Sequence, residues 1–441
     1  MIRHPNRIVS SLAVAFLAAA TLTTSVSASS RLRPKGEDEE RERQEKKVEP
    51  SQLTRLEAGM VKPIFRQAVG FVESEPLSNF PAYPGDVVDE MYKYKTENED
   101  DHREVNDKNT EGTGVDANPN GPVQRDGALQ TAAPAAPAIP GPSLTFEGLS
   151  AADNTTVFGT TVAPPDPTMA VGPNDVVQTT NNLVRVYDKN GVPRGPAFKL
   201  SSLFASLGGI CATNDQGDTI VLYDRMANRW MISQFAFTGT TTPPYHQCIA
   251  VSKNGDPTGA YWVYDFVMPG VEFNDYFKFG AWPDAYYMTD RQFTNGGPFN
   301  SFGCFAFDRA KMLVGNPTAG FIYFNLGSPM PLLSNSSSGM NPTDFTGLTP
   351  PPAGAPNVFA VYTDDAFTGD TADTVRLFNF HADFAVPANS TFTERSESPV
   401  AVASFDSRNP SGRSDIEEPA PAVATDSLDS IGDRLMLLQP E

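Results

Sequence analysis

Two runs of the sequence with strand-like composition, VRVYDKNG (184–191) and CIAVSKNG (248–255), end in the same tripeptide, and their asparagines lie 64 residues apart. Asn-Gly between two β-strands is the strongest short signal for a hairpin turn, because both residues tolerate a positive φ angle. CFAFDRAK (304–311) and VRLFNFHAD (375–383) occupy the same place in two further stretches. The chain therefore repeats one small unit, at intervals of roughly 55 to 75 residues.

A second β-rich run precedes each of these four and is expected to pair with it. These partners are DVVQTTNN (175–182), RWMISQFAF (229–237), PDAYYMTD (283–290) and NVFAVYTDD (357–365). Runs of Val, Ile, Tyr, Phe and Thr broken by Gly, Pro, Asn and Asp are typical of strands. Small sheets that recur at this spacing predict an all-β, propeller-like array of about four antiparallel blades. A β-sandwich is the alternative.

The last stretch of the sequence, DSLDSIGDRLMLLQPE (426–441), opens with turn residues and continues into one more strand-like run, DRLMLL. A blade that stopped there would leave a strand edge and an apolar face open. We therefore expect the array to be incomplete at the C-terminus.

The start of the chain is typical of a secretory signal peptide. Arg3 and Arg7 precede an apolar run and then a small-residue step that ends at Ala28, so residues 1–28 are expected to be removed on export. An uncleaved membrane anchor is the alternative, although the run is short and diluted by Ser and Thr. The mature protein is predicted to be secreted, extracellular or periplasmic.

The composition of residues 29–143 predicts a largely disordered acidic pro-region or stalk. It ends in a Pro/Ala linker, TAAPAAPAIPGP (131–142), which is expected to be extended and stiff. One apolar island, FRQAVGFVESEPLSNFPAY (65–83), is a candidate to dock on the folded domain, which we place at residues 144–441.

The charge of the chain excludes one class of partner. The formal net charge is -20, and loss of Arg3 and Arg7 with the signal peptide takes it to -22. Such a chain repels phosphate, so no nucleic acid and no anionic membrane surface is expected as a partner.

The chain contains three cysteines, Cys211, Cys248 and Cys304. In an oxidising compartment two of them are expected to form a disulfide, which leaves one free thiol. Cys304 lies in the apolar run FGCFAFD and is typical of a buried small hydrophobic residue. The pair Cys211 with Cys248 is therefore favoured, and the other pairings stay open.

Several segments together carry a resemblance to a known family. DPTMAVGPNDVVQTTN, YDRMANRWMISQF, IAVSKNGDPTGAYWVYDF and FNDYFKFGAWPDAYYMT resemble a family of secreted bacterial β-propeller-like proteins without assigned activity, over roughly residues 155 to 440. Members of that family usually continue with further β-units beyond the equivalent of Leu435. The resemblance implies no catalytic residues.

The signals of enzymatic chemistry are sparse. No G-x-S-x-G elbow, H-E-x-x-H motif or Gly-rich phosphate loop occurs. Glycosidases generally need two carboxylates at a defined separation, and a sialidase-like site needs arginines with a Tyr and acid pair. The candidate catalytic residues are Asp224, Arg225, Arg229, Glu272, Asp284 and Tyr286.

The structural interpretation of these candidates is favoured. Glu272 is the only glutamate between residues 151 and 393, and a predominance of aspartate is typical of turns capped by carboxylates. Asp224 is expected to form a hairpin-turn ion pair with Arg225 and Arg229. Asp284 is expected to bond the backbone of the Trp-Pro-Asp turn, while Tyr286 and Tyr287 face opposite sides of one strand.

Calcium is the one metal for which the sequence offers candidate ligands. Only NDQGD (214–218) and DDAFTGDTAD (364–373) offer clustered oxygen ligands suited to calcium, through Asp215, Asp218, Asp364, Asp365 and Asp370. Neither run has EF-hand spacing, and solvated acidic loops are the alternative. No other cofactor is predicted.

The sequence thus favours an exported propeller-like scaffold that binds an extracellular glycan or protein through loops at one end of its channel. The alternatives are a glycan-active hydrolase on the same scaffold, sialidase-like or glycosidase-like, and a truncated non-functional fragment.

Overall fold

The computed structural model of the chain describes residues 55–80, 141–159, 162, 165–327, 339–363, 372–405, 414–417 and 427–429. All of these belong to the compact unit formed by residues Lys47–Glu441. The predicted signal peptide, residues 29–54 and 81–140 of the predicted pro-region, and the strand-like run at 433–438 lie outside the described residues.

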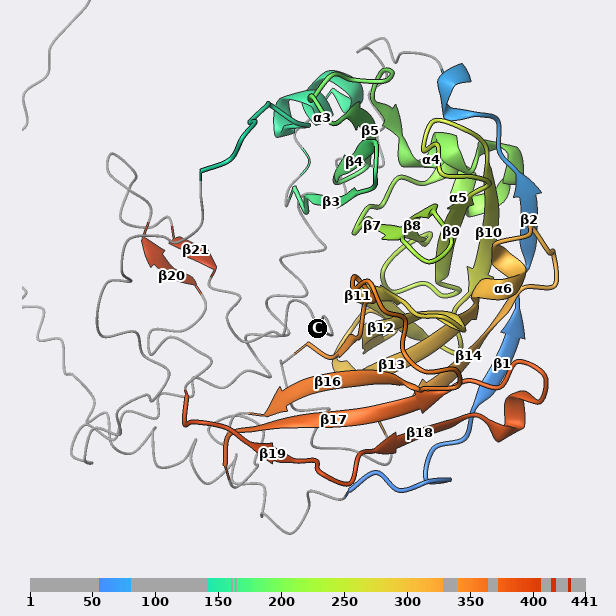
Figure 1. Cartoon of the computed structure of the whole chain (residues 1–441), viewed down its shortest axis with the longest axis vertical. Helices are drawn as coiled ribbons and strands as arrows, with labels where there is room; N and C mark the ends of the chain where they lie inside the picture. The colour runs from blue at the N-terminus through green and yellow to red at the C-terminus, as the bar shows by residue number, and fades with distance from the viewer. Residues whose placement is uncertain are drawn as a thin grey trace, which may run out of the picture. The chain divides into compact units, whose positions relative to one another are not determined.

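The first two blades are antiparallel sheets whose strands follow chain order (Figure 1). The strands of the first blade are β3 (Thr168–Val171), β4 (Asp175–Thr180), β5 (Leu183–Asp188) and β6 (Phe198–Lys199). Those of the second are β7 (Ile220–Asp224), β8 (Arg229–Ala236), β9 (His246–Ser252) and β10 (Tyr261–Val267). Two short helices and a 3-10 turn connect them, α4 (Leu200–Leu203), η3 (Ala205–Leu207) and α5 (Gly209–Thr213).

The third and fourth blades repeat this order. The third contains β11 (Glu272–Ala281), β12 (Ala285–Thr294), β13 (Phe299–Asp308) and β14 (Gly320–Asn325), with α6 (Arg309–Met312) after β13. The fourth contains β15 (Asn341–Pro342), β16 (Asn357–Thr363), β17 (Thr374–His381), β18 (Thr391–Glu394) and β19 (Val400–Ala401), with η5 (Pro387–Asn389) between β17 and β18. A separate hairpin joins β20 (Ser414–Glu417) to β21 (Ser427–Asp429).

The predicted strand pairs form the second and third strands of the four blades, and the all-β, four-bladed prediction is confirmed. Successive blades share apolar cores. One core joins blades one and two around Trp230, a second joins blades two and three around Tyr286, and a third joins blades three and four around Tyr287. Because the middle blades bury both faces, the sandwich alternative is wrong: each sheet of a sandwich buries one face.

The innermost strands lie beside one another. β3 contacts β7, β7 contacts β11, and β11 contacts β15. Each is the first strand of its blade, so the four run around a common channel, as in a propeller. The inner strands at this channel position the candidate site described below.

The free face of the first blade is covered by a helix. α3 (Ala151–Phe158) packs Val157 and Phe158 against Leu183 of β5. The helix begins at a capping box, in which the Ser150 N–H donates to the Asp153 carboxylate at 2.8 Å, and it ends at Gly159 with φ 72°. This cap buries a face that a preceding blade would otherwise cover.

The described part of the apolar island, residues 65–80, docks on the blades. β1 (Ile64–Gln67) pairs with β14, and β2 (Gly70–Glu73) pairs with β10, so each of these blades gains a fifth, outermost strand (Figure 1). η2 (Leu77–Asn79) follows β2. An ordered segment therefore lies inside the region predicted to be largely disordered.

Cys211 of α5 and Cys248 of β9 form a disulfide, which is the pair that the sequence favoured. Cys304 is a buried free thiol. In the part of the chain that the structure describes, no helix combines the length and apolarity needed to cross a membrane.

We predict that Cys211→Ser with Cys248→Ser lowers the free energy of unfolding by about 3 kcal/mol, because the bond closes a 37-residue loop in the unfolded chain. Urea denaturation of the double variant and of the reduced wild-type protein checks this. The two should agree, and a double variant as stable as the oxidised wild type would show that the bond adds nothing.

Candidate functional site

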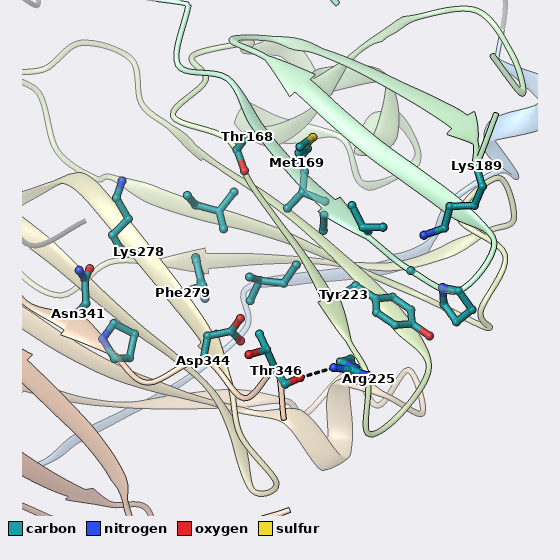
Figure 2. Close-up of a pocket in the computed structure, with 18 residues that line it drawn as sticks. Thr168, Met169, Lys189, Tyr223, Arg225, Lys278, Phe279, Asn341, Asp344 and Thr346 are labelled. Carbon is teal, nitrogen blue, oxygen red and sulfur yellow. Dashed lines mark hydrogen bonds between the residues drawn. The ribbon is translucent and has the colours of Figure 1, made fainter. Parts of the chain in front are cut away.

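A cavity of about 730 Å³ lies where the inner strands of all four blades meet. Its walls come from β3 and the turn after it, from β7, from β11 and from the segment that follows β15. The lining residues are Thr168–Pro173, Lys189, Ile220–Tyr223, Arg225, Lys278, Phe279, Asn341, Pro342, Asp344 and Thr346. In Figure 2, Thr168 and Met169 lie across the space from Asp344 and Thr346. This volume is within the range of small-molecule sites.

The wall formed by β3 is apolar and accessible. Met169 is 64% exposed and Val171 is 52% exposed, while Thr168 and Ala170, which alternate with them, are half-buried. Alternation along a strand sends successive side chains to opposite faces. The exposed pair therefore offers this cavity an adaptable apolar contact surface.

Basic residues outnumber acidic residues in the cavity lining, although the chain as a whole is acidic. The lining carries three basic residues, Lys189, Arg225 and Lys278, and one acid, Asp344, whereas the whole chain has 53 acids and 33 bases. The Arg225 guanidinium donates to the carbonyl oxygen of Thr346, so a turn of blade two is joined to the loop that follows β15 (Figure 2). Cations gathered in a cleft concentrate their field there.

A bulge in β11 positions Lys278. The register of β11 against β12 shifts between Asp275 and Lys278, and Tyr276 within the bulge has φ 47°. The Lys278 ammonium lies 3.7 Å from the centroid of the Tyr276 ring, a cation–π contact. Left-handed backbone at a non-glycine residue costs about 1–3 kcal/mol and is concentrated at functional sites. The strained bulge thus marks the edge of this cavity.

Asp344 is held against the end of β11. Its carboxylate accepts the Ala281 N–H at 2.9 Å, and the next residue, Phe345, donates its N–H to the Ala281 carbonyl oxygen at 3.0 Å. Burial raises the pKa of Asp344 to about 6, and the negative charge of Asp224 contributes in the same direction. A carboxyl group with this pKa exchanges a proton near neutral pH.

Two of the predicted catalytic residues, Asp224 and Tyr286, meet in a structural cluster. The Asp224 carboxylate is fully buried and accepts from the Tyr286 hydroxyl at 2.9 Å and from the Arg309 guanidinium at 2.7 and 3.1 Å. Burial raises the pKa of Tyr286 well above its usual value. The cluster joins blade two to blade three, and both carboxylate oxygens are occupied, so Asp224 is not available to a substrate.

The predicted turn ion pair of Asp224 with Arg225 and Arg229 is wrong. The partner of Asp224 is Arg309, 85 residues away in the chain. Arg229 donates to the carbonyl oxygens of Ala227 and Asn228 at 3.0 and 2.9 Å, and Arg225 donates to Thr346. The Arg309 guanidinium reaches both oxygens of the Asp224 carboxylate with two hydrogen bonds, which is the strong bidentate arrangement of this pair.

Glu272 and Asp284 lie at opposite ends of β11. Glu272 begins the strand and accepts from the Thr294 hydroxyl, with its nearer oxygen at 3.1 Å, whereas Asp284 follows its end and accepts from the Tyr287 hydroxyl at 2.9 Å. A ten-residue strand is roughly 30 Å long, and glycosidase carboxylates are about 5–9.5 Å apart. These two acids therefore do not form a catalytic pair. Burial also raises the pKa of Asp284.

The opposite orientation of the tyrosines on β12 is confirmed. Tyr286 and Met288 belong to the core between blades two and three, and Tyr287 belongs to the core between blades three and four. The aromatic run in this part of the sequence thus builds blade contacts.

The two calcium candidates among the described residues, Asp215 and Asp218, each have a structural partner and do not form a shared metal site. Asp215 accepts from the backbone N–H and the hydroxyl of Ser201 at 2.6 and 2.8 Å. Asp218 lies in a turn with φ 45°, and its N–H donates to Asn181. Asp364, Asp365 and Asp370 lie outside the described residues. Among the residues that the structure describes, no three His, Cys, Asp or Glu side chains gather as a metal site.

Four residues of the cavity and of the buried cluster were not identified from the sequence: Lys189, Lys278, Arg309 and Asp344. Asp344 lies in NPTDFTG, and the strand there, β15, has only two residues, which is too short for a strand signal. Lys278 is the one lysine in the aromatic run of β11, and that isolated charge was the available signal.

Comparison with known proteins gives a distant likeness in structure alone. No family model matches the sequence, and no curated protein matches it. Among solved structures, a xylan β-1,4-xylosidase from Bacillus halodurans C-125 is 12% identical with a TM-score of 0.26, over 53% of this chain and 42% of that one. An α-L-arabinofuranosidase from Lactobacillus brevis is 12% identical with a TM-score of 0.28, over 52% and 71%.

A GH43 endo-arabinanase from Bacillus licheniformis is 10% identical with a TM-score of 0.26, over 52% of this chain and 92% of that one. The matched region covers 42% of the xylosidase, which is less than half the length of that protein. Likeness at these values does not assign an activity to the present chain.

We predict that Asp224→Asn lowers the free energy of unfolding by about 3–5 kcal/mol, because it leaves the Arg309 charge buried without its anionic partner. Arg229→Ala is the matched control and should cost under about 1 kcal/mol, since Arg229 donates only within its own turn. Urea denaturation of both variants measures this. Equal losses would contradict the assignment of the buried pair.

The raised pKa of Asp344 predicts a pH dependence of stability. Its folded-state pKa, about 6, is above the value in an unfolded chain, about 3.9. The neutral carboxyl therefore stabilises the fold fully below about pH 4, and that stabilisation, at most about 3 kcal/mol, is lost as the pH rises through 6. Asp344→Asn should remove this slope from unfolding measurements between pH 4 and 7. An unchanged slope would contradict it.

Proposed function

We propose that the protein is an exported binding protein that holds an anionic segment of an extracellular glycan in the channel cavity. The observation that carries this proposal is the reversal of charge in the lining, which has three basic residues, Lys189, Arg225 and Lys278, and one acid, Asp344. The location outside the cytoplasm follows from the predicted signal peptide.

Electrostatics decide whether such a site can attract an anion on a strongly acidic protein. At physiological ionic strength the Debye length is about 8 Å, so exposed acids farther from the cavity are largely screened. Charges within the cavity are screened less and act on a ligand at contact distance. The local cations therefore dominate the binding energy, while the net charge of -20 slows the approach of an anion.

The remaining lining suits hydroxylated rings. Tyr223 presents a half-buried aromatic ring, and Thr168 and Thr346 contribute hydroxyl groups. Apolar walls with a few polar groups are typical of ligand sites. A uronic acid residue combines a carboxylate for the cations with ring faces and hydroxyls for the other groups.

A hydrolase is the second candidate, and Asp344 is the observation that favours it. A carboxyl group with a pKa of about 6 that lines the cavity suits a general acid. Asp224, whose charge acts on Asp344, is closed off by Arg309 and Tyr286. Catalysis would therefore need a second group from a part of the chain beyond the described residues.

We predict that the full-length protein binds a galacturonic acid tetrasaccharide and that a neutral galactose tetrasaccharide binds at least tenfold more weakly in calorimetric titration. Lys278→Gln should weaken binding of the acidic ligand about tenfold, which corresponds to about 1.4 kcal/mol. Lys62→Gln, which changes an exposed lysine of the segment before β1, is the matched control and should bind normally.

Four outcomes would be decisive. Equal affinity for both tetrasaccharides, or normal binding by Lys278→Gln, would contradict the anionic-glycan proposal. Binding of an acidic peptide but of neither sugar would assign a protein ligand. Release of reducing ends by the wild type but not by Asp344→Asn would establish the hydrolase.

A further inference from the structure

One segment of the chain, residues 55–80, contacts all four blades in turn; we name it the strap. Leu56 exchanges contacts with Glu394 of blade four, donating its N–H to the carboxylate at 3.2 Å and accepting the Glu394 N–H at 2.9 Å. β1 then pairs with blade three, and β2 pairs with blade two. Phe80 ends the strap against Phe198 of blade one, with ring centroids 5.2 Å apart.

The strap changes blades between two adjacent residues. The N–H of Ala68 donates to the Ala319 carbonyl oxygen of blade three at 2.9 Å, and the N–H of Val69 donates to the Asp265 carbonyl oxygen of blade two at 2.8 Å. Ala68 also packs against the core that these two blades share. The strap therefore crosses the joint between the blades while it remains hydrogen-bonded to both.

Side chains anchor both ends of the strap. Leu56 is 1% exposed in the core between blades three and four, and Leu77 is 5% exposed in the core between blades one and two. Between them, Phe71 lies 5.0 Å from Tyr264, measured between ring centroids. The Glu73 carboxylate pairs with Lys253 at 2.5 Å. The strap is thus held by apolar anchors, one ion pair and two strand ladders.

Through these contacts the strap is held on the blades in the way that a separate bound peptide would be. Residues 81–140, which the structure does not describe, separate it from the blades along the chain, and each contact named above is non-covalent. The strap also covers the outer edges of β10 and β14, which would otherwise offer unpaired N–H and C=O groups. Nothing in its geometry requires the covalent connection.

We propose that the strap is a non-covalent tether, which stays on the outer rim of the blades after the chain is cut within residues 81–140. Proteolytic processing there yields a two-chain protein and keeps the residues that precede the strap attached to the propeller. A single cut within residues 81–140 therefore does not release the part of the predicted pro-region that precedes it, and strand addition is the mode of attachment.

The test uses the full chain with a site-specific protease sequence inserted after Gly114. After cleavage, the N-terminal fragment should co-elute with the blades in size-exclusion chromatography, and the melting temperature should stay within about 2 °C of the uncut protein. A fragment that separates, whether the blades stay folded or precipitate, would overturn the proposal.

Two variants identify the contacts that hold the strap. Leu77→Asp should release the fragment after cleavage, while the uncut variant keeps it bound because the linker maintains a high effective concentration. Glu75→Gln, at an exposed position of the same segment, is the matched control and should retain it.

An exchange experiment on the wild-type protein tests the proposal even if the Leu77→Asp variant fails to fold. A labelled synthetic peptide of residues 54–81 should not exchange into the uncut wild type within hours, but should exchange slowly into the cleaved wild type. Equal labelling of the cut and uncut proteins would show that the peptide binds elsewhere and would overturn the tether.

Discussion

Face-to-face packing of successive sheets is the constraint on which the rest of this structure depends. A sheet buried between two neighbours must be apolar on both faces, and β12 shows how the sequence meets this, with Tyr286 directed to one core and Tyr287 to the other. Polar chemistry is then confined to strand ends, the channel and a few buried clusters. The Asp224 and Arg309 pair is such a cluster, since it closes the joint between blades two and three with each hydrogen-bonding oxygen of the carboxylate satisfied.

The same packing fixes the geometry of the candidate site. The inner strands cannot shift without moving whole blades, so Lys278 on β11 and Arg225 after β7 are held at set positions around the cavity. Flexibility is left to side chains such as Met169. A rigid charged frame with an adaptable apolar wall is better suited to selecting a charge than to selecting one exact shape.

Local signals predicted the blades, and non-local contacts escaped prediction. The second and third strands of each blade carry their own alternation and turn residues, so runs such as 229–237 and 248–255 were identifiable one by one. The partner of Asp224 lies 85 residues away, and Arg55 of the strap donates to a carbonyl oxygen 343 residues away, at Ser398. The periodicity of a sequence carries no information about contacts between residues so far apart along the chain. Asp344 escaped because two-residue strands such as β15 carry no pattern.

Strand edges account for both remaining features of the molecule, the strap and the channel. Every blade has an outer edge and an inner edge, and an unpaired edge invites other strands. The outer edges of blades two and three are closed by β2 and β1. The inner edges belong to strands of very different length, from β15 with two residues to β11 with ten. Residues of all four inner strands line the cavity between them. The channel therefore offers a ligand charged and polar side chains, which an acidic glycan can use, whereas the outer rim already uses strand addition, through β1 and β2.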